Sequence, residues 1–500
     1  MLIRYTSAAL IATLSVLASA AGKTYVVELV DGINAANILL NPTDHLTKIL
    51  GPHIKKSITI GAFNCLIAEL EDRDALALNL FPSVKAVMPD AFVKIVDAPS
   101  SPLNIAQNLS VESNALTSEP SFKVQIEDLS LLNQKIPEDG AASSTTTDEI
   151  KSVPAKSWDK EKPTQTQKDA PSHLVRINTR EGFHNTNSPD MSYTYKHTGA
   201  GVHVYVIDSG IQIEHPDFEG RAIRGANFVP DEGPGDMNGH GTHVAGLIGS
   251  KTYGVAKDLT IVEVKALSGK GQGAISAILE AMQWAANDRQ SKGHNGVLNM
   301  SLGGFFYSIL NDAADAVKKS GMSIVVAAGN EKTSAALFSP ASAPEAITVA
   351  AMNDKKDTIA WFSNFGDLVD VFAPGFEVLS LNAKDFDTPI QFSGTSMASP
   401  IVAGVVAVYM EEGISVDQMK SELVERSTRG ALSRSLRKSW RYYSTPDRLV
   451  YVGPPTETNT VSVQSPFTDE DINSQTVMPS FGQFTMAHET VKELSYEAVQ

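Results

Sequence analysis

The run Val202-His203-Val204-Tyr205-Val206-Ile207 decides the fold, because it is apolar almost without interruption. A second run, Ser323-Ile324-Val325-Val326-Ala327-Ala328, has the same character. Strands that are apolar on both faces are typical of parallel sheets covered by helices on each side. Helical periodicity over residues 275–286 and 309–319 supplies such helices between the strands. The sequence therefore predicts an α/β fold, a doubly wound and mostly parallel sheet with helices on both faces.

We place this α/β unit at residues 170–452 and predict four further segments around it. Arg4, a short apolar run and the small residues Ala18-Ser19-Ala20 predict a signal peptide over residues 1–20. Strands and helices alternate over residues 24–97, as in a small α+β domain of the ferredoxin-like type. Ser, Thr, Pro, Lys and Glu dominate residues 98–169, which predicts a disordered linker. Residues 453–500 hold seven acidic residues and one lysine, which predicts an acidic, disordered tail.

Composition excludes several classes of protein. The 500 residues are 42% hydrophobic and 20% charged, as in ordinary globular chains. A net charge of −16 argues against a nucleic-acid partner, which would need a basic face. The single cysteine excludes an internal disulfide framework and a multi-cysteine metal site. After the signal peptide, no apolar run reaches the roughly 20 residues that a membrane span requires.

These features predict a protein of the secretory pathway. We expect a monomer without a membrane partner, and the sequon Asn108-Leu109-Ser110 predicts a glycoprotein. The extracellular medium, the cell or spore wall and the vacuole remain open as destinations.

Three segments of the large unit combine a reactive side chain with glycines and other small residues. Asp208 ends an apolar run, His240 lies within Asn238-Gly239-His240-Gly241, and Ser396 lies within Ser393-Gly394-Thr395-Ser396. Serine, histidine and aspartate are the nucleophile, general base and orienting carboxylate of acyl-transfer enzymes. Their order along the chain, Asp then His then Ser, is the order in subtilisin and differs from those of α/β-hydrolases and chymotrypsin-like enzymes. Asn330 follows the second apolar run and is a candidate donor to an oxyanion.

These four segments resemble the subtilase (subtilisin-like) family, and within it the fungal proteinase K and cerevisin branch. The similarity covers nearly all of the large unit. It implies a serine endopeptidase that hydrolyses peptide bonds of polypeptide substrates through an acyl-enzyme. It also implies that residues 24–97 are a propeptide, an intramolecular inhibitor that keeps the secreted enzyme a zymogen until it is cleaved.

The resemblance assigns further residues to binding. Two strands, around residues 299–304 and 267–273, are expected to pair with the substrate backbone on either side. Small residues at the end of the second apolar run are expected to line a pocket for an apolar side chain of the substrate. The chemistry requires no cofactor, but the family implies a structural calcium, with a solvated or capping aspartate as the alternative. The substrate residues are Ser301, Leu302, Gly303, Gly271, Gly273, Ala328 and Gly329, and the calcium ligands are Asp370 with the carbonyl groups of Pro344 and Ala346.

A second hypothesis comes from a different class. A chain with the subtilase fold could be catalytically inactive or weakly active and serve a structural role in a cell or spore wall. The presence of Asp208, His240, Ser396 and Asn330 favours the enzyme.

Overall fold

The computed structural model describes residues 23–33, 45–95, 162–182, 190–454, 456 and 458–461. The predicted signal peptide, residues 98–161 of the predicted linker, Asn108 and residues 462–500 of the predicted tail lie outside the described residues.

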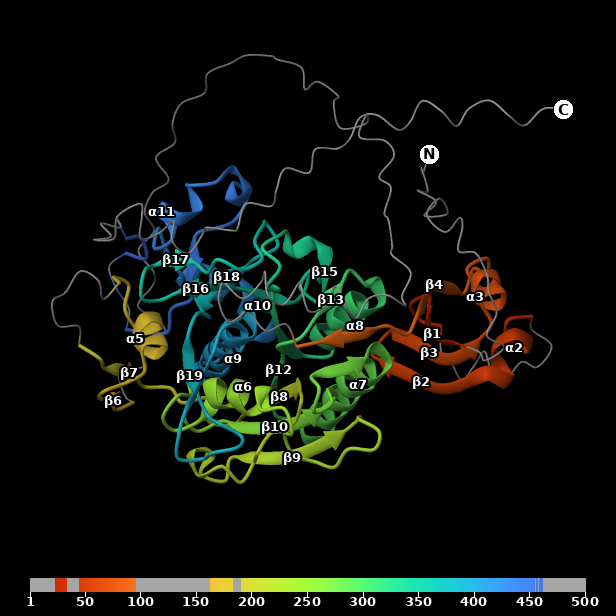
Figure 1. The fold of residues 1–500 in the computed structure, drawn as a ribbon, viewed down its shortest axis with the longest axis horizontal. Helices are drawn as coiled ribbons and strands as arrows, with labels where there is room; N and C mark the ends of the chain where they lie inside the picture. Colours follow the sequence, from red (N-terminus) through yellow and green to blue (C-terminus); the bar gives the residue numbers. More distant parts are fainter. Residues whose placement is uncertain are drawn as a thin grey trace, which may run out of the picture.

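A ten-stranded sheet forms the centre of the large unit in the described part of the chain (Figure 1). The strand order is β21-β22-β18-β16-β14-β12-β8-β10-β9, and β17 pairs with β16. Neighbours from β22 to β9 run parallel, whereas β17 and β21 pair antiparallel. The mostly parallel sheet that the apolar runs predicted is thus confirmed. Its strands are β8 (Val202–Asp208), β9 (Ala222–Asn227), β10 (Thr260–Lys265), β12 (Asn295–Met300), β14 (Met322–Ala327), β16 (Ile347–Asn353), β17 (Thr358–Ile359), β18 (Val371–Pro374), β21 (Thr428–Arg429) and β22 (Arg448–Leu449).

Helices cover both faces of this sheet, and β8 shows why its sequence is apolar throughout. Val204 and Val206 pack in one core, with α6 (His240–Gly249) and α9 (Thr395–Glu411). Tyr205 and Ile207 pack in a second core on the opposite face, with α7 (Ile275–Lys292) and α8 (Ser308–Lys319). Successive side chains of a strand point to opposite faces, so a strand between two helical layers is buried on both.

Shorter elements surround the sheet. Antiparallel pairs join β6 with β7, β13 with β15 and β19 with β20. The bounds are β6 (Gln165–Gln167), β7 (Tyr193–Tyr195), β13 (Gly304–Phe305), β15 (Phe338–Ser339), β19 (Val378–Ser380), β20 (Ile390–Phe392), α5 (Ser172–Asn178), α10 (Val416–Arg426) and α11 (Ser433–Leu436), with short 3₁₀ turns at Pro216–Phe218, Ala335–Leu337 and Trp440–Tyr442.

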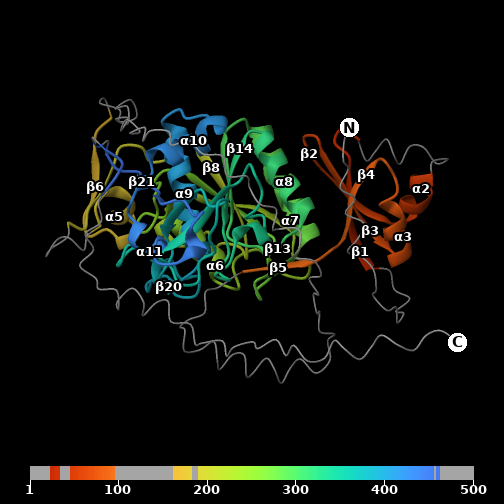
Figure 2. The same ribbon diagram turned by 90° about the horizontal axis from the view of Figure 1, so that it is seen from above.

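A separate four-stranded antiparallel sheet, ordered β2-β3-β1-β4, forms the N-terminal unit beside α7 and α8 (Figure 2). On β1, Val27 and Leu29 pack against the unit's own helices, whereas Val26 belongs to the core that contains α7 and α8. The sheet therefore lies between two helical layers, one of which belongs to the large unit. The elements are β1 (Lys23–Leu29), α2 (His45–Leu50), a 3₁₀ turn (Gly51–His53), β2 (Ile54–Ile60), β3 (Phe63–Leu70), α3 (Asp72–Leu78), β4 (Val84–Pro89) and β5 (Phe92–Lys94).

Both ends of the large unit extend beyond the boundaries assigned from the sequence. Residues 165–167, assigned to the linker, form β6 and pair with β7. Residues 459–461, assigned to the tail, pair with Arg429, whose amide donates to the carbonyl of Asn459 at 2.7 Å. Polar composition predicted coil there, but edge pairing needs only backbone groups, which composition does not report.

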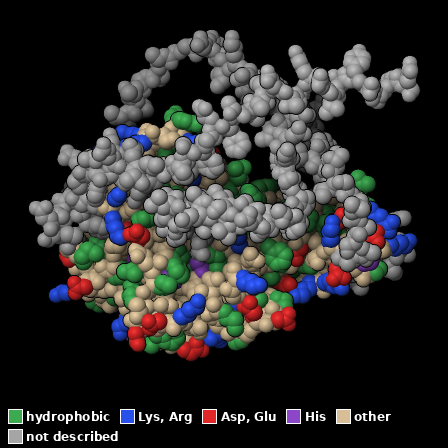
Figure 3. Space-filling model, viewed as in Figure 1, with side chains coloured by type: hydrophobic (Ala, Val, Ile, Leu, Met, Phe, Trp, Pro, Cys, Tyr) green, Lys and Arg blue, Asp and Glu red, His purple; other side chains and the backbone are tan. Residues whose placement is uncertain are grey.

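The distribution of surface charge and the apolar character of the helices can be compared with the two classes that composition argued against, nucleic-acid binders and membrane-spanning proteins. On the face drawn in Figure 3, acidic and basic side chains of the described residues are interspersed among apolar ones. Within the described ranges no single helix has the length and apolar character to cross a bilayer. The bent pair α9 and α10 meets those two criteria together, and α9 is buried in the core.

Candidate active site

Asp208 and His240 are in contact at the edge where the parallel strands end. Asp208 is the last residue of β8 and has no exposed surface. His240 is the first residue of α6, and its Nδ1 lies 2.8 Å from Asp208 Oδ1. The side chain of His240 is only 2% exposed, so little water competes with this hydrogen bond. The contact selects the tautomer with hydrogen on Nδ1 and leaves Nε2 as the basic nitrogen.

A buried carboxylate that the sequence analysis did not identify holds the start of α6. Asp236 Oδ1 accepts hydrogen bonds from the amide of Gly239 at 2.7 Å and from Ser209 Oγ at 2.9 Å. Its Oδ2 accepts from the amide of Thr242 at 2.8 Å and from the Thr242 hydroxyl at 2.6 Å. These bonds satisfy amides that a helix start leaves without intrahelical partners. Asp236 therefore positions His240, which lies between Gly239 and Thr242.

Glycine at position 241 permits the close approach of the two segments. A Cβ atom there would lie 2.1 Å from the carbonyl oxygen of Gly210 and 3.2 Å from Asp208 Cβ. The first distance is far below van der Waals contact, so any side chain would push α6 away from β8. Gly241 thus permits the Asp208–His240 contact.

Ser396 lies in the first turn of α9. The helix begins at Thr395, so Pro400 stands inside the helix, beyond its first turn. Proline has no N–H, so the carbonyl of Ser396, four residues earlier, lacks its helical donor. The hydroxyl of Ser301 donates to that carbonyl at 2.9 Å, and Ser396 Oγ donates to the carbonyl of Ser301 at 3.1 Å. This exchange fixes Ser396 against the end of β12.

The strand register brings Ser396 to the same edge as Asp208. β8 and β12 are parallel neighbours, and Met300 pairs with Ile207. Ser301 and Asp208, the next residues, therefore leave adjacent strands at the same level. Helices α6 and α9, which carry His240 and Ser396, pack on the same face of the sheet.

Asn330 lies at this edge too, just beyond β14. Its Oδ1 accepts hydrogen bonds from the amide of Thr395 at 2.8 Å and from the Thr395 hydroxyl at 2.9 Å. The two bonds to Oδ1 fix the orientation of the side-chain amide. They therefore also fix the direction of the Nδ2 donor group. Thr395 immediately precedes Ser396, so Asn330 is coupled directly to the turn that carries the serine.

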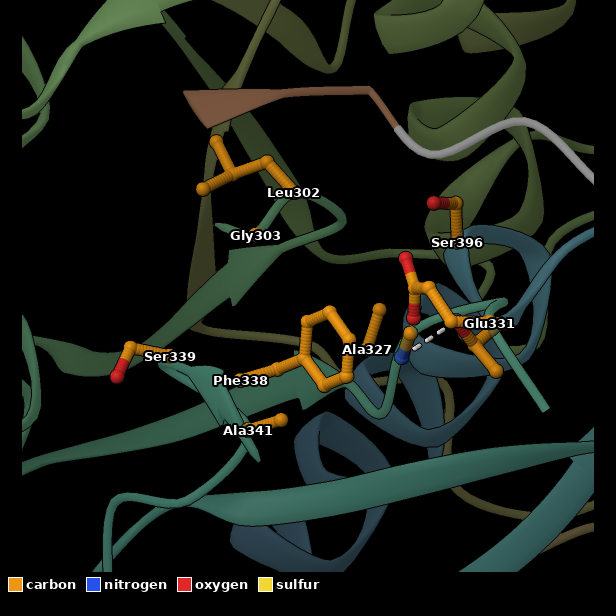
Figure 4. Close-up of a pocket in the computed structure, with 10 residues that line it drawn as sticks. Leu302, Gly303, Ala327, Glu331, Phe338, Ser339, Ala341 and Ser396 are labelled. Atoms are coloured by element: carbon orange, nitrogen blue, oxygen red, sulfur yellow. Dashed lines mark hydrogen bonds between the residues drawn. The ribbon is translucent and has the colours of Figure 1, made fainter. Parts of the chain in front are cut away.

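A small, mostly apolar pocket opens beside Ser396 (Figure 4). Of the predicted substrate residues, Leu302, Gly303 and Gly329 line it. Ala328 does not, because alternate residues of an extended chain face opposite ways: Ala327 faces the pocket and Ala328 faces a core cluster. The lining residues are Leu302, Gly303, Ala327, Gly329, Glu331, Phe338, Ser339, Ala341, Thr395 and Ser396.

The carboxylate of Glu331 stands among these apolar residues, and the sequence analysis missed it. Glu331 Oε2 accepts a hydrogen bond from Asn364 Nδ2 at 2.7 Å. Burial raises the pKa of Glu331 above its ordinary value, although the bond from Asn364 counteracts the rise. Nothing in the sequence around Asn330 distinguished this glutamate from a solvated one.

A segment of the chain itself lies beside the pocket and is paired on both of its sides. β5 pairs antiparallel with β11 (Gln272–Ala274), which contains Gly273. Just beyond β5, the amide of Ile95 donates to the carbonyl of Gly271 at 2.9 Å. On the opposite side of β5, the amide of Lys94 donates to the carbonyl of Gly303 at 3.4 Å. Both predicted substrate-pairing edges are thus paired with β5, which Figure 4 draws above the pocket.

The three expected calcium ligands come together, but around a lysine. Lys420 Nζ lies 3.0 Å from Asp370 Oδ2, 3.0 Å from the carbonyl of Pro344 and 2.8 Å from that of Ala346. Calcium takes about six to eight oxygen ligands at roughly 2.3–2.6 Å. In the described residues no group of three or more His, Cys, Asp or Glu could hold a metal ion. With Lys420 in place these residues do not fit calcium, because its ammonium group occupies the point where the ion was expected.

Comparison with known proteins identifies the class. The profile of the subtilase family, peptidase S8, matches residues 199–440. A solved structure described as the crystal structure of a cold adapted subtilisin-like serine proteinase is 37% identical, has a TM-score of 0.50, and matches 57% of this chain and 98% of that chain. The chain belongs to the subtilase family.

Two curated fungal relatives agree with this assignment. Subtilase-type proteinase RRT12 of Saccharomyces cerevisiae is 41% identical over 299 residues, which are 57% of this chain and 60% of that protein. Subtilisin-like protease 7 of Arthroderma otae is 47% identical over 243 residues, 48% of this chain and 58% of that protein. The chain thus spans about three fifths of the length of these relatives.

Proposed function

We propose that the chain is a secreted serine endopeptidase that hydrolyses peptide bonds through an acyl-enzyme and is made as a propeptide-inhibited zymogen. Membership of the subtilase family supports the reaction class. The observation that carries the proposal is the 2.8 Å contact between Asp208 and His240 at the sheet edge that also carries Ser396 and Asn330. Covalent labelling of Ser396, described at the end of the Discussion, tests it.

The reaction follows from the chemistry of these groups. Ser396 Oγ attacks the carbonyl carbon of the scissile bond, and Nε2 of His240 accepts the hydroxyl proton. His240 then gives that proton to the departing amine, and an ester joins the acyl group to Ser396. Water then attacks the carbonyl carbon of the ester while His240 accepts its proton. His240 returns this proton to Ser396 Oγ, and the peptide acid is released. Asp208 holds the Nδ1–H of His240 and stabilises the imidazolium as it forms.

Asn330 is suited to bind the oxyanion of the tetrahedral intermediate. Thr395 occupies its Oδ1, so the side chain is oriented before substrate arrives. We assign Asn330 Nδ2 and the backbone N–H of Ser396 as the two donors. Donors fixed in advance stabilise the developing charge without reorganisation during the reaction.

Asn330→Ala is expected to lower kcat by about 10²- to 10³-fold and to leave KM nearly unchanged, because the oxyanion forms only after binding. Steady-state hydrolysis of a peptide anilide by the processed protein measures both constants. Asn311→Ala removes another buried amide, on α8 and outside the pocket, and should leave kcat unchanged. A loss confined to KM would remove Asn330 from the oxyanion site.

The zymogen part of the proposal rests on the pairing of β5 and on the contacts of the segment just before it. An extended segment bonded on both sides imitates a bound peptide substrate. Asp90 Oδ1 and Oδ2 accept hydrogen bonds from the amide and the hydroxyl of Ser276, at 3.0 and 2.6 Å, in the first turn of α7. A carboxylate is favourable there because a helix start carries partial positive charge. The arrangement supports residues 24–97 as the intramolecular inhibitor, with an apolar side chain preferred in the pocket.

The same interface supplies a pH prediction through Glu28. This carboxylate has no exposed surface and faces Lys85 of β4 at 2.9 Å, while Lys85 also contacts Asp312 of α8 at 3.0 Å. Cys65 is its partner residue on β3. Burial raises the pKa of Glu28 from 4.5 to about 7, although Lys85 counteracts the rise and Asp312 adds to it. The packed N-terminal unit therefore favours the protonated carboxyl group.

Because the pKa of Glu28 is raised, its carboxyl group stabilises the packed N-terminal unit most below pH 4.5. This contribution to the free energy of unfolding is lost as the pH rises through about 7. Hydrogen exchange of the β1 amides in the Ser396→Ala chain, corrected for intrinsic exchange rates, should show protection falling between pH 5 and 8. Glu28→Gln should flatten this dependence. Glu280→Gln, which removes an exposed interface pair with Lys56, should keep it. An unchanged slope in Glu28→Gln would assign the effect to another group.

A further inference from the structure

The corner where α10 meets the sheet is built like a cation site. Asp370 immediately precedes β18, and Pro344 and Ala346 immediately precede β16. One carboxylate and two carbonyl oxygens from these segments converge on a single point, which the ammonium group of Lys420 occupies at 2.8–3.0 Å. Lys420 reaches this point from α10.

The number of donors and the charge both match an ammonium ion. Lysine carries three N–H donors, and Lys420 has one oxygen acceptor for each. The single negative charge of Asp370 balances a single positive charge, whereas a divalent cation would leave the corner with net positive charge. Asp370 is only 8% exposed, so such an imbalance would be poorly screened.

Two neighbouring acids of this corner pair with a second lysine. Lys318 of α8 contacts Glu345 at 3.3 Å and Asp417 at 2.9 Å. Lys318 thus pairs with these two acids, whereas Asp370 pairs with Lys420. Lys318 therefore serves as a matched control, being a lysine of the same surface groove outside the three-oxygen site.

We propose that the ammonium group of Lys420 takes the place of a bound divalent cation and joins α10 to the segments before β16 and β18. A covalently attached cation cannot dissociate or be extracted, so this corner needs no calcium for its stability. The inference is independent of the proposed peptidase activity, because it concerns the unfolding of the chain and not its reaction.

Thermal unfolding tests the inference on the full chain carrying Ser396→Ala, which avoids self-digestion. The readout is the difference in Tm between excess CaCl2 and excess EDTA, compared with the same difference in a chain that also carries Asp370→Asn. The parent is expected to show no Asp370-dependent calcium shift. Lys420→Ala frees the three oxygens for a cation and should unfold several degrees lower in EDTA, with about 2–4 °C recovered in calcium for each kcal/mol of binding.

Lys420→Met keeps the aliphatic packing and should behave as Lys420→Ala does, which guards against a folding defect of the smaller residue. Lys318→Ala should gain no calcium response. A parent whose Tm rises in calcium through Asp370 would overturn the proposal. So would a calcium shift of zero in both Lys420 variants, because the three oxygens would then not constitute a cation site.

Discussion

Replacement of Ser396 by alanine is expected to abolish peptide hydrolysis and to leave the chain uncleaved. Without Oγ no acyl-enzyme forms, and the rate should fall by about 10⁶-fold, as removal of the triad serine does in subtilisin. The fold should persist, because the backbone carbonyl of residue 396 still accepts from Ser301 and only one hydroxyl group is lost. Hydrolysis of a peptide anilide and N-terminal sequencing of the secreted protein measure the two effects.

Ser399→Ala is the matched control for this variant. Ser399 lies in α9, one turn beyond Ser396, and its hydroxyl donates to Asn299 Oδ1 at 2.8 Å. Its removal should lower the free energy of unfolding by about 1 kcal/mol and leave kcat near that of the parent. The parent and this control should begin at a residue after Ile95. Processing of the Ser396→Ala chain at the same site and rate, in the absence of other proteases, would contradict the role of Ser396.

Asp208→Asn is expected to lower kcat by about 10⁴-fold with little change in structure. The amide has nearly the shape of the carboxylate but no negative charge, and its NH2 group favours the wrong tautomer of His240. Because Asp208 is fully buried, no water can replace the lost acceptor readily. The rate of self-processing and the hydrolysis rate per protein molecule report the loss.

Asp236→Asn separates catalysis from helix capping. The Asp236 carboxylate accepts five hydrogen bonds, from the turn before α6, from the start of α6 and from Ser209, and Asn can accept on one oxygen only. We expect its main effect on stability, with the free energy of unfolding lowered by about 1–3 kcal/mol. If urea unfolding were unchanged and kcat fell as in Asp208→Asn, Asp236 would have to act in the reaction itself.

Equal activity of Asp208→Asn and the parent would remove Asp208 from the proposed relay.

The sequence predicted the main sheet because its apolar runs carry direct information. Val202–Asp208 is buried on both faces, as is typical of a parallel strand between helical layers. The candidates Asp208 and Asn330 were chosen at the ends of apolar runs, and His240 and Ser396 by residue type, neighbouring glycines and their order along the chain. Such segments can be recognised from the local sequence alone.

Other features depend on contacts between distant segments, which no local pattern encodes. Asp236 resembles any acidic loop residue until its bonds to the start of α6 are seen. Ala328 was expected in the pocket, but strand alternation points it into the core. Lys420 lies 50 residues after Asp370 in the sequence, and only the packing of α10 brings its ammonium group to the expected calcium ligands. The pairing of β5 with β11 on one side and with Gly303 on the other was likewise not encoded in any local pattern.

Covalent labelling with a fluorophosphonate, followed by mass spectrometry of the digested protein, asks most directly whether distant residues 208, 240 and 396 act as one catalytic centre. The processed protein is expected to carry one phosphonyl adduct, on Ser396, and the adduct should vanish in Ser396→Ala and nearly vanish in Asp208→Asn. Processed protein that stays unlabelled at Ser396 would contradict the account and favour an inactive scaffold with the subtilase fold.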